Sequence, residues 1–103
     1  MMQAFFCKLV PPRTTFVQDL TPAEREVMGR HAAYWKRLIE RGTQVFALGL
    51  VLDPAGAFGV GIVEVEDMAA MRALTEHDPA ITSAMGLHYE IHPIPRGVMH
   101  SAR

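Results

Sequence analysis

The chain has few of the features that mark membrane proteins, disulfide-rich proteins or nucleic-acid-binding proteins. Cys7 is its single cysteine, which excludes an internal disulfide framework and a zinc site built from several cysteines. No apolar run approaches the roughly 20 residues of a membrane span, and no basic stretch followed by a long apolar segment begins the chain. The formal net charge of −1 gives no reason to expect nucleic acid or an anionic membrane as a partner. We therefore expect a soluble, cytoplasmic protein.

Internal repeats, low-complexity tracts, linkers and phosphate-binding glycine loops are also missing. The run GVGIVE (59–64) lacks the spacing of a dinucleotide-binding loop and no helix pattern follows it directly. The 103 residues are enough for one domain, 1–103, with a modest core, and half of them are apolar. Cys7 lies in an apolar run and is expected to be a small buried residue.

The clearest element is a helix predicted over residues 21–41. Thr21 and Glu24 have the spacing of a capping box, Pro22 suits the first helical position, and Gly42 suits a left-handed C-cap. Its apolar residues recur at three- and four-residue steps and include an imidazole: Val27, Met28, His31, Trp35 and Leu38. An ionisable side chain therefore points the same way as the core-facing residues.

The remaining chain alternates between strand and helix patterns. Short apolar or alternating runs predict strands over 3–10, 45–52, 58–65 and 87–92, the last ended by Pro93. Asp67 and Asp78 have the positions of N-caps for helices over 68–76 and 80–84. Residues 11–20 read as a surface loop and residues 94–103 as a C-terminal tail. Gly59 and Gly61 leave one strand face almost without side chains, for close packing or for a pocket.

This order of elements favours an α+β fold, a four-stranded antiparallel sheet with both helices on one face. It is the ferredoxin-like βαββαβ layout. The strands carry apolar residues on both faces; in 45–52 the alternation assigns Phe46, Leu48 and Leu50 to one face and Val45, Ala47 and Val51 to the other. Since two helices cover one side only, we predict a homodimer in which a second copy covers the other sheet face.

His31 has two interpretations. It is either a core histidine bonded to a carbonyl group or a general acid/base, whose tautomer a carboxylate would fix. Asp78 is a candidate partner, although an Asp-Pro step also explains itself as a helix cap. Asp53 lies in the predicted hairpin turn, where aspartate is a common turn former.

Three polar residues of the last strand, His88, Glu90 and His92, suggest a metal site. Alternate residues share a strand face, but at ~3.3 Å per residue the two histidines would lie about 13 Å apart, too far to share one ion. A solvated face explains them better, so no metal site is predicted. Nothing in the sequence supplies the electropositive setting that a reactive Cys7 would need.

Taken together, these features resemble the YCII-related (YciI-like) family of small dimeric α+β barrel proteins. The resemblance covers residue 4 to about residue 94 and rests on an ordered set of short motifs: Lys8-Leu9-Val10-Pro11-Pro12-Arg13, His31 eleven residues before Gly42, Ala47-Leu48-Gly49, Leu52-Asp53-Pro54, His77-Asp78-Pro79 and Tyr89-Glu90-Ile91-His92-Pro93.

The resemblance implies a ferredoxin-like protomer that dimerises through its sheet and a His31–Asp78 pair in a pocket. It implies acid/base chemistry on a small molecule, of the lactone isomerase or dehydrochlorinase type, with no cofactor and no metal. Arg13 is our candidate for binding a substrate carboxylate, and Asp53 and His77 are candidate pocket neighbours. The alternatives are a non-catalytic, stress-related or small-molecule-binding dimer and a partner-binding subunit.

Overall fold

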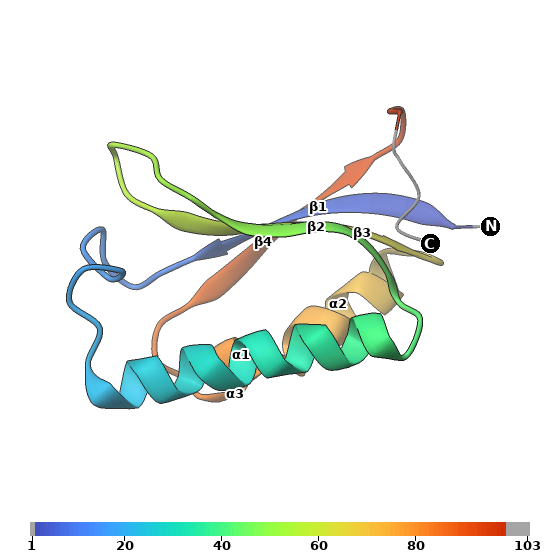
Figure 1. Ribbon diagram of the computed structural model, residues 1–103. Coiled ribbons are helices and arrows are strands. Elements are labelled where there is room, and N and C mark those ends of the chain that lie inside the picture. Colours follow the sequence, from blue (N-terminus) through green and yellow to red (C-terminus); the bar gives the residue numbers. More distant parts are fainter. Residues whose placement is uncertain (1, 99–103) are drawn as a thin grey trace.

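The computed structural model describes residues 2–98, which contain four strands and three helices joined by loops. In chain order they are β1 (Gln3–Val10), α1 (Pro22–Glu40), β2 (Gln44–Val51), β3 (Phe58–Val65), α2 (Met68–Glu76), α3 (Pro79–Thr82) and β4 (His88–Ile94). The strands form one antiparallel sheet in the order β2-β3-β1-β4. The helices all lie on one face of it (Figure 1). The predicted α+β, ferredoxin-like fold is confirmed.

Helix α1 begins and ends where its sequence signals predict. The Thr21 hydroxyl accepts a hydrogen bond from the Glu24 N–H at 3.1 Å, and Glu24 Oε1 accepts one from the Thr21 N–H at 2.9 Å. Beyond the C-cap Arg41, Gly42 has a φ of +98°, which glycine adopts without strain. No helix within residues 2–98 is both long and apolar enough to cross a membrane.

Two strands differ from the sequence prediction. β2 is shifted by one residue, to Gln44–Val51, and β4 begins one residue later than predicted and does not stop before Pro93. Pro93 pairs with Phe5, and the strand continues to Ile94. β4 is an edge strand with one unpaired side, which is where a sheet tolerates proline. Ile94 therefore belongs to the sheet; residues 99–103 of the predicted tail lie outside the described residues.

A β-bulge in β2 corrects the predicted division of its side chains between the two faces. The register shifts between Val45 and Ala47, so that Val45 pairs with Val63 and Leu48 pairs with Gly61. Cross-strand partners share a face, and Val63 and Gly61 are both on the helix side of β3. Val45 and Leu48 thus lie on the same face, although simple alternation places them on opposite faces.

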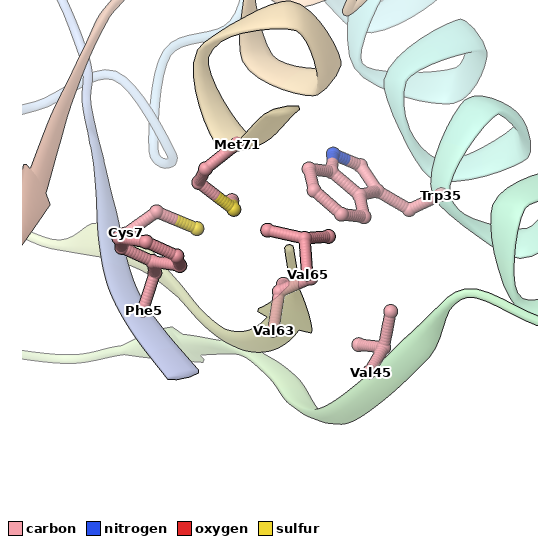
Figure 2. Close-up of a cluster of buried hydrophobic side chains, with 7 residues drawn as sticks. All are labelled: Phe5, Cys7, Trp35, Val45, Val63, Val65 and Met71. Carbon is pink, nitrogen blue, oxygen red and sulfur yellow. The ribbon is translucent and has the colours of Figure 1, made fainter. Parts of the chain in front are cut away.

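The main core lies between the sheet and helices α1 and α2 (Figure 2). Its buried members are Phe5, Cys7, Trp35, Val45, Val63, Val65 and Met71. Cys7 is buried, as predicted, and burial raises the pKa of its thiol to about 11. The thiol is therefore protonated at neutral pH and is a poor nucleophile.

The other face of the sheet carries no helix (Figure 1). Phe6 and Ile62 pair there, because each alternates with residues that face the helices. Lys8 pairs with Val60 on the same face, so charged and apolar side chains are mixed. The described residues leave this apolar area without a covering layer. A second copy as its cover stays a prediction.

We expect Gly61→Ala to destabilise the fold and Gly29→Ala to stabilise it. A Cβ at Gly61 would lie 2.9 Å from Cys7 Sγ and 3.1 Å from Leu48 Cδ2, and overpacking of this kind costs roughly 1–3 kcal/mol. Gly29 lies exposed in α1 with nothing within 4 Å of its Cβ position. Alanine there should add up to about 1 kcal/mol. Urea unfolding measures both changes; a Gly61→Ala variant as stable as the wild-type protein would contradict the close approach at Gly61.

Candidate functional site

A cavity of about 400 Å³ opens between α1, the loop 11–20 and the β2–β3 hairpin. The N-terminal half of α1 lies below this end of the sheet (Figure 1). The lining is mostly apolar and comes from all of these elements together with β1 and β4: Cys7, Leu9, Pro11, Phe16, Val17, Met28, His31, Ala32, Trp35, Lys36, Leu48, Gly49, Leu50, Ala57, Phe58, Gly59, Val60, Gly61, Leu87 and Tyr89. Apolar walls with a few polar groups are typical of small-molecule sites.

The glycines of β3 and the bulge of β2 shape this cavity. Gly59 and Gly61 line it, and neighbouring side chains also approach both positions closely. Both interpretations of these glycines, close packing and a pocket, therefore hold. The bulge directs Leu48 and Leu50 to the helix side, where they line the cavity and remain 43% and 57% exposed. The hairpin wall of the cavity thus carries two exposed leucines.

His31 lies on the cavity wall with one ring nitrogen held by a carboxylate. Its Nδ1 is 2.8 Å from Asp78 Oδ2 and 3.0 Å from Oδ1. The imidazole is 22% exposed and lines the cavity. Among residues 2–98, Nε2 makes no hydrogen bond. The structure therefore brings His31 and Asp78 together, as the sequence analysis predicts.

Asp78 is fully buried and accepts hydrogen bonds from three further donors. The Trp35 indole N–H and the Tyr89 hydroxyl donate to Oδ2 at 2.9 and 2.5 Å. The Ala80 N–H donates to Oδ1 at 2.9 Å, so Asp78 also caps α3, which covers Pro79–Thr82 rather than the predicted 80–84. A buried carboxylate is tolerated only when donors of this kind satisfy it. Asp78 is both a helix cap and the partner of His31.

The electrostatics of this cluster fix the protonation of its members. Burial by itself raises the pKa of Asp78, but hydrogen bonds from His31 and Tyr89 outweigh it and hold the pKa of this carboxyl below its ordinary value. Burial and the nearby Asp78 charge raise the pKa of the Tyr89 phenol. At neutral pH the carboxylate is ionised and accepts a hydrogen bond from His31 Nδ1–H. The Nε2 lone pair of a neutral ring is then free.

Trp35 and Tyr89 are members of the cluster that sequence reasoning missed. Trp35 lies one helical turn after His31 and was assigned only to the apolar stripe of α1. Tyr89 pairs with Leu9 on the helix side of the sheet, and its hydroxyl also accepts from Trp35 Nε1 at 3.3 Å. Their polar ends were the available signal, because buried Trp N–H and Tyr O–H groups usually find a partner.

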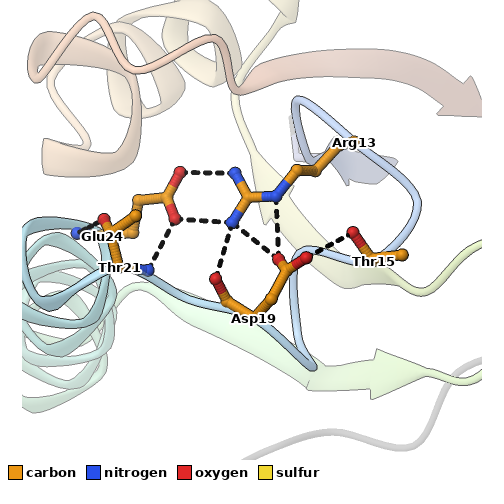
Figure 3. Close-up of polar contacts among 5 residues, drawn as sticks. All are labelled: Arg13, Thr15, Asp19, Thr21 and Glu24. Atoms are coloured by element: carbon orange, nitrogen blue, oxygen red, sulfur yellow. Dashed lines mark hydrogen bonds and ion pairs between the residues drawn. The ribbon is translucent and has the colours of Figure 1, made fainter.

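Arg13 is held by two carboxylates rather than placed at the His31–Asp78 pair (Figure 3). Its guanidinium donates to both oxygens of Glu24 at 2.8 Å and to Asp19 Oδ1 at 2.8 Å. Asp19 also accepts from the Thr15 hydroxyl at 2.7 Å. The hydrogen bonds from Arg13 and from the Thr21 N–H lower the pKa of Glu24 to about 2. This cluster ties the loop 11–20 to the first turn of α1, and Arg13 does not line the cavity.

Asp53 and His77 also lie away from the cavity. Asp53 Oδ1 accepts from the Ala55 N–H at 2.8 Å in the β2–β3 turn and borders a second hollow of about 340 Å³ beside Arg13. His77 is the exposed C-cap of α2, with Nδ1 2.7 Å from the Ala73 carbonyl oxygen. Both side chains make local contacts. The substrate-binding roles predicted for Arg13, Asp53 and His77 gain no support from their positions.

Three polar side chains of β4, those of His88, Glu90 and His92, lie on the sheet face that carries no helix. His88 and Glu90 form an exposed ion-pair contact at 3.8 Å, and the His92 ring lies 6.1 Å from the Phe6 ring. Within residues 2–98, no group of three metal-binding side chains is arranged to hold an ion.

We expect Asp78→Asn to lower the free energy of unfolding by roughly 2–4 kcal/mol, because an amide cannot accept from all four buried donors. The pKa of Asp78 is lowered in the fold. Its ionised form therefore stabilises the protein above the pKa of an unfolded aspartate, about 4, and this contribution is lost as the pH falls below that value.

Chemical denaturation of the wild-type protein and of Asp78→Asn across pH measures the effect, with Asp67→Asn as the matched control. Asp67 caps α2 through the Ala70 N–H at 2.8 Å but is exposed, and asparagine caps helices as well as aspartate does. The loss in Asp78→Asn should be full at neutral pH and should shrink in acid. An equal loss at about pH 7 and about pH 3 would contradict the assignment.

Comparisons with known proteins agree with this architecture. A family model, the YCII-related domain, matches residues 4–95. No curated protein matches the chain. The fold is similar to that of the uncharacterized protein TM1266 from Thermotoga maritima, with a TM-score of 0.57 and 9% identity, covering 91% of this chain and 99% of that chain. That similarity shows the fold alone. Since the family model spans nearly all of the described residues, the chain belongs to the YCII-related family.

Proposed function

We propose that the cavity is a site of acid/base catalysis on a small molecule, in which His31 transfers the proton and Asp78 orients the imidazole. One observation carries the proposal, namely the two-sided placement of the imidazole. Nδ1 contacts a fully buried carboxylate at 2.8 Å, while the ring itself lines a mostly apolar cavity. This is the arrangement that a histidine base needs, with one nitrogen fixed and the other facing the substrate.

Asp78 acts on the ring in two ways. It accepts a hydrogen bond from Nδ1–H, which leaves Nε2 as the basic nitrogen, and its charge stabilises the imidazolium that forms when Nε2 takes up a proton. Trp35 and Tyr89 position Asp78, since both donate to the oxygen that contacts His31. Asp78 itself is fully buried, and burial strengthens the electrostatic interactions that it makes.

The reaction class that fits is proton transfer at a carbon next to a carbonyl group, of the lactone isomerase or dehydrochlorinase type. In the isomerisation, His31 takes a proton from one carbon and returns it to another as the double bond moves. In the dehydrochlorination, His31 takes the proton while the adjacent C–Cl bond breaks and chloride leaves with its electron pair. Neither reaction transfers electrons to a cofactor. The isomerisation returns the proton that it removes, and in the dehydrochlorination the electrons of the broken C–H bond form the new C=C bond as chloride leaves.

We expect the protein to accelerate hydrogen–deuterium exchange at the acidic carbon of an unsaturated five-membered lactone such as α-angelica lactone. Proton NMR in D₂O follows the loss of that signal without knowledge of the natural substrate. His31→Gln should slow the exchange about 10²–10⁴-fold, because general base catalysis contributes that factor. Asp78→Asn should slow it as well while leaving His31 in place.

His77→Gln is the matched control, since it removes an imidazole that is exposed and lies outside the cavity. It should leave the exchange rate unchanged. If the wild-type protein binds the lactone but His31→Gln exchanges it at the same rate, the catalytic role is refuted. The cavity would then be a binding site without chemistry.

The proposed working unit is a homodimer that joins through the sheet face without helices. The support is physical: Phe6 and Ile62 are paired on a face that the described residues leave uncovered. Lys8 pairs with Glu90 on that face, so both charge signs are present for a self-complementary, two-fold contact.

We expect Ile62→Asp to shift the protein from dimer to monomer in sedimentation velocity at micromolar concentration, because a buried carboxylate without a partner opposes association. Ile39→Asp makes the same change at a 47% exposed position of α1 on the helix layer and should leave the dimer intact. A monomeric wild-type protein, or a dimer that survives Ile62→Asp, would contradict the sheet-to-sheet arrangement.

A further inference from the structure

The charges around the cavity are of one sign. Among the described residues that line it there is no aspartate or glutamate, and the carboxylate nearest to the chemistry, Asp78, is sealed behind His31 with no exposed surface. Lys36 is the one fixed cation in the lining. A bound anion is therefore attracted by an ammonium group and meets no exposed carboxylate, whereas a bound cation is repelled by the same ammonium group.

Lys36 is free to bind a ligand. It lies on α1 directly after Trp35 and one helical turn beyond Ala32, and these residues line the cavity together. The residue is exposed, which places its flexible side chain at the mouth rather than in the interior. Among residues 2–98 its ammonium forms no ion pair or hydrogen bond. The Arg13 guanidinium, by contrast, is paired with Asp19 and Glu24.

The remaining walls favour a flat, apolar molecule. Rings from α1, β4 and the loop 11–20 line the cavity, namely Trp35, Tyr89 and Phe16. The Phe58 ring lies instead 4.4 Å from the Lys8 ammonium on the sheet face without helices. Gly59 and Gly61 also line the cavity, with the side chains of Leu9, Cys7 and Leu48 packed close to their Cα atoms, so this part of the wall is apolar as well. A volume of about 400 Å³ is within the range of small-molecule sites.

We infer that the ligand of this cavity is a small, planar, unsaturated or aromatic carboxylate, whose carboxylate pairs with Lys36 at the mouth. Its apolar ring lies among the aromatic side chains. A third part of the inference, a reacting C–H group of the ligand beside His31 Nε2, rests on the proposed function. Lys36 is thus a specificity-determining residue that selects anions over neutral molecules of the same shape.

The single tryptophan of the chain makes the inference directly testable. Trp35 lines the cavity, so its fluorescence reports a ligand that enters. Benzoate and benzamide serve as probes because they have nearly the same shape and differ in charge. At about pH 8, where an ordinary imidazole is neutral, the wild-type protein should bind benzoate about five- to tenfold more tightly than benzamide at low salt.

Matched variants assign the preference to the ammonium group. Lys36→Met keeps the length of the side chain and should abolish the preference for benzoate, whereas Lys36→Arg should retain it. Arg37→Met removes the next cation of the same helix, which does not line the cavity, and should leave the preference unchanged. Added salt should reduce the preference of the wild-type protein and leave benzamide binding constant.

Equal affinity of the wild-type protein for the two probes, no change of fluorescence with either probe, or a preference that survives in Lys36→Met would overturn the inference. His31→Gln separates this test from that of the proposed function. It should keep the preference for benzoate while losing the lactone exchange. An intact preference together with an unchanged exchange rate refutes the catalytic proposal alone.

Discussion

The buried carboxylate of Asp78 is the interaction on which the arrangement of this protein depends. It accepts hydrogen bonds from α1 through His31 and Trp35, from β4 through Tyr89, and from the first turn of α3 through Ala80. An ionised group without exposed surface is strongly destabilising unless all of these donors stay in place. The contacts that join the helix layer to the sheet are therefore the same contacts that orient the imidazole, so the fold and the site share one set of geometric requirements.

A second polar cluster holds the N-terminus of α1. Arg13 joins Asp19 to Glu24, and Glu24 also completes the capping box with Thr21. The loop held in this way supplies Phe16 to the cavity wall. The start of α1 and the loop beside it thus behave as one unit, and the cavity lies between this unit and the hairpin. Arg13 has a structural role that its position in a proline-rich loop did not suggest.

Much of the fold was predictable because its signals are local. Thr21, Gly42 and Asp67 mark helix ends through groups a few residues away, and short apolar runs mark the strands. The site was predictable in part: a histidine on an apolar stripe and an Asp-Pro step nominated His31 and Asp78, but only tertiary structure joins residues 47 positions apart. The contact between Arg13 and Glu24 had no such local signal. The capping box accounts for one use of the Glu24 carboxylate, and its geometry leaves room for a guanidinium as well.

The bulge in β2 divides the strand into one part that packs in the core and another that lines the cavity. Before it, Val45 belongs to the packed interior; after it, Leu48 and Leu50 form a wall that no other part of the described chain buries. One extra residue at the bulge sets which side chains of each half face the helices. Substitutions or length changes after the bulge therefore alter the shape of the cavity without disturbing the core. Relatives with the same histidine and aspartate can in this way diverge in what they accept through the hairpin alone, and the hairpin is where a search for differences in selectivity should begin.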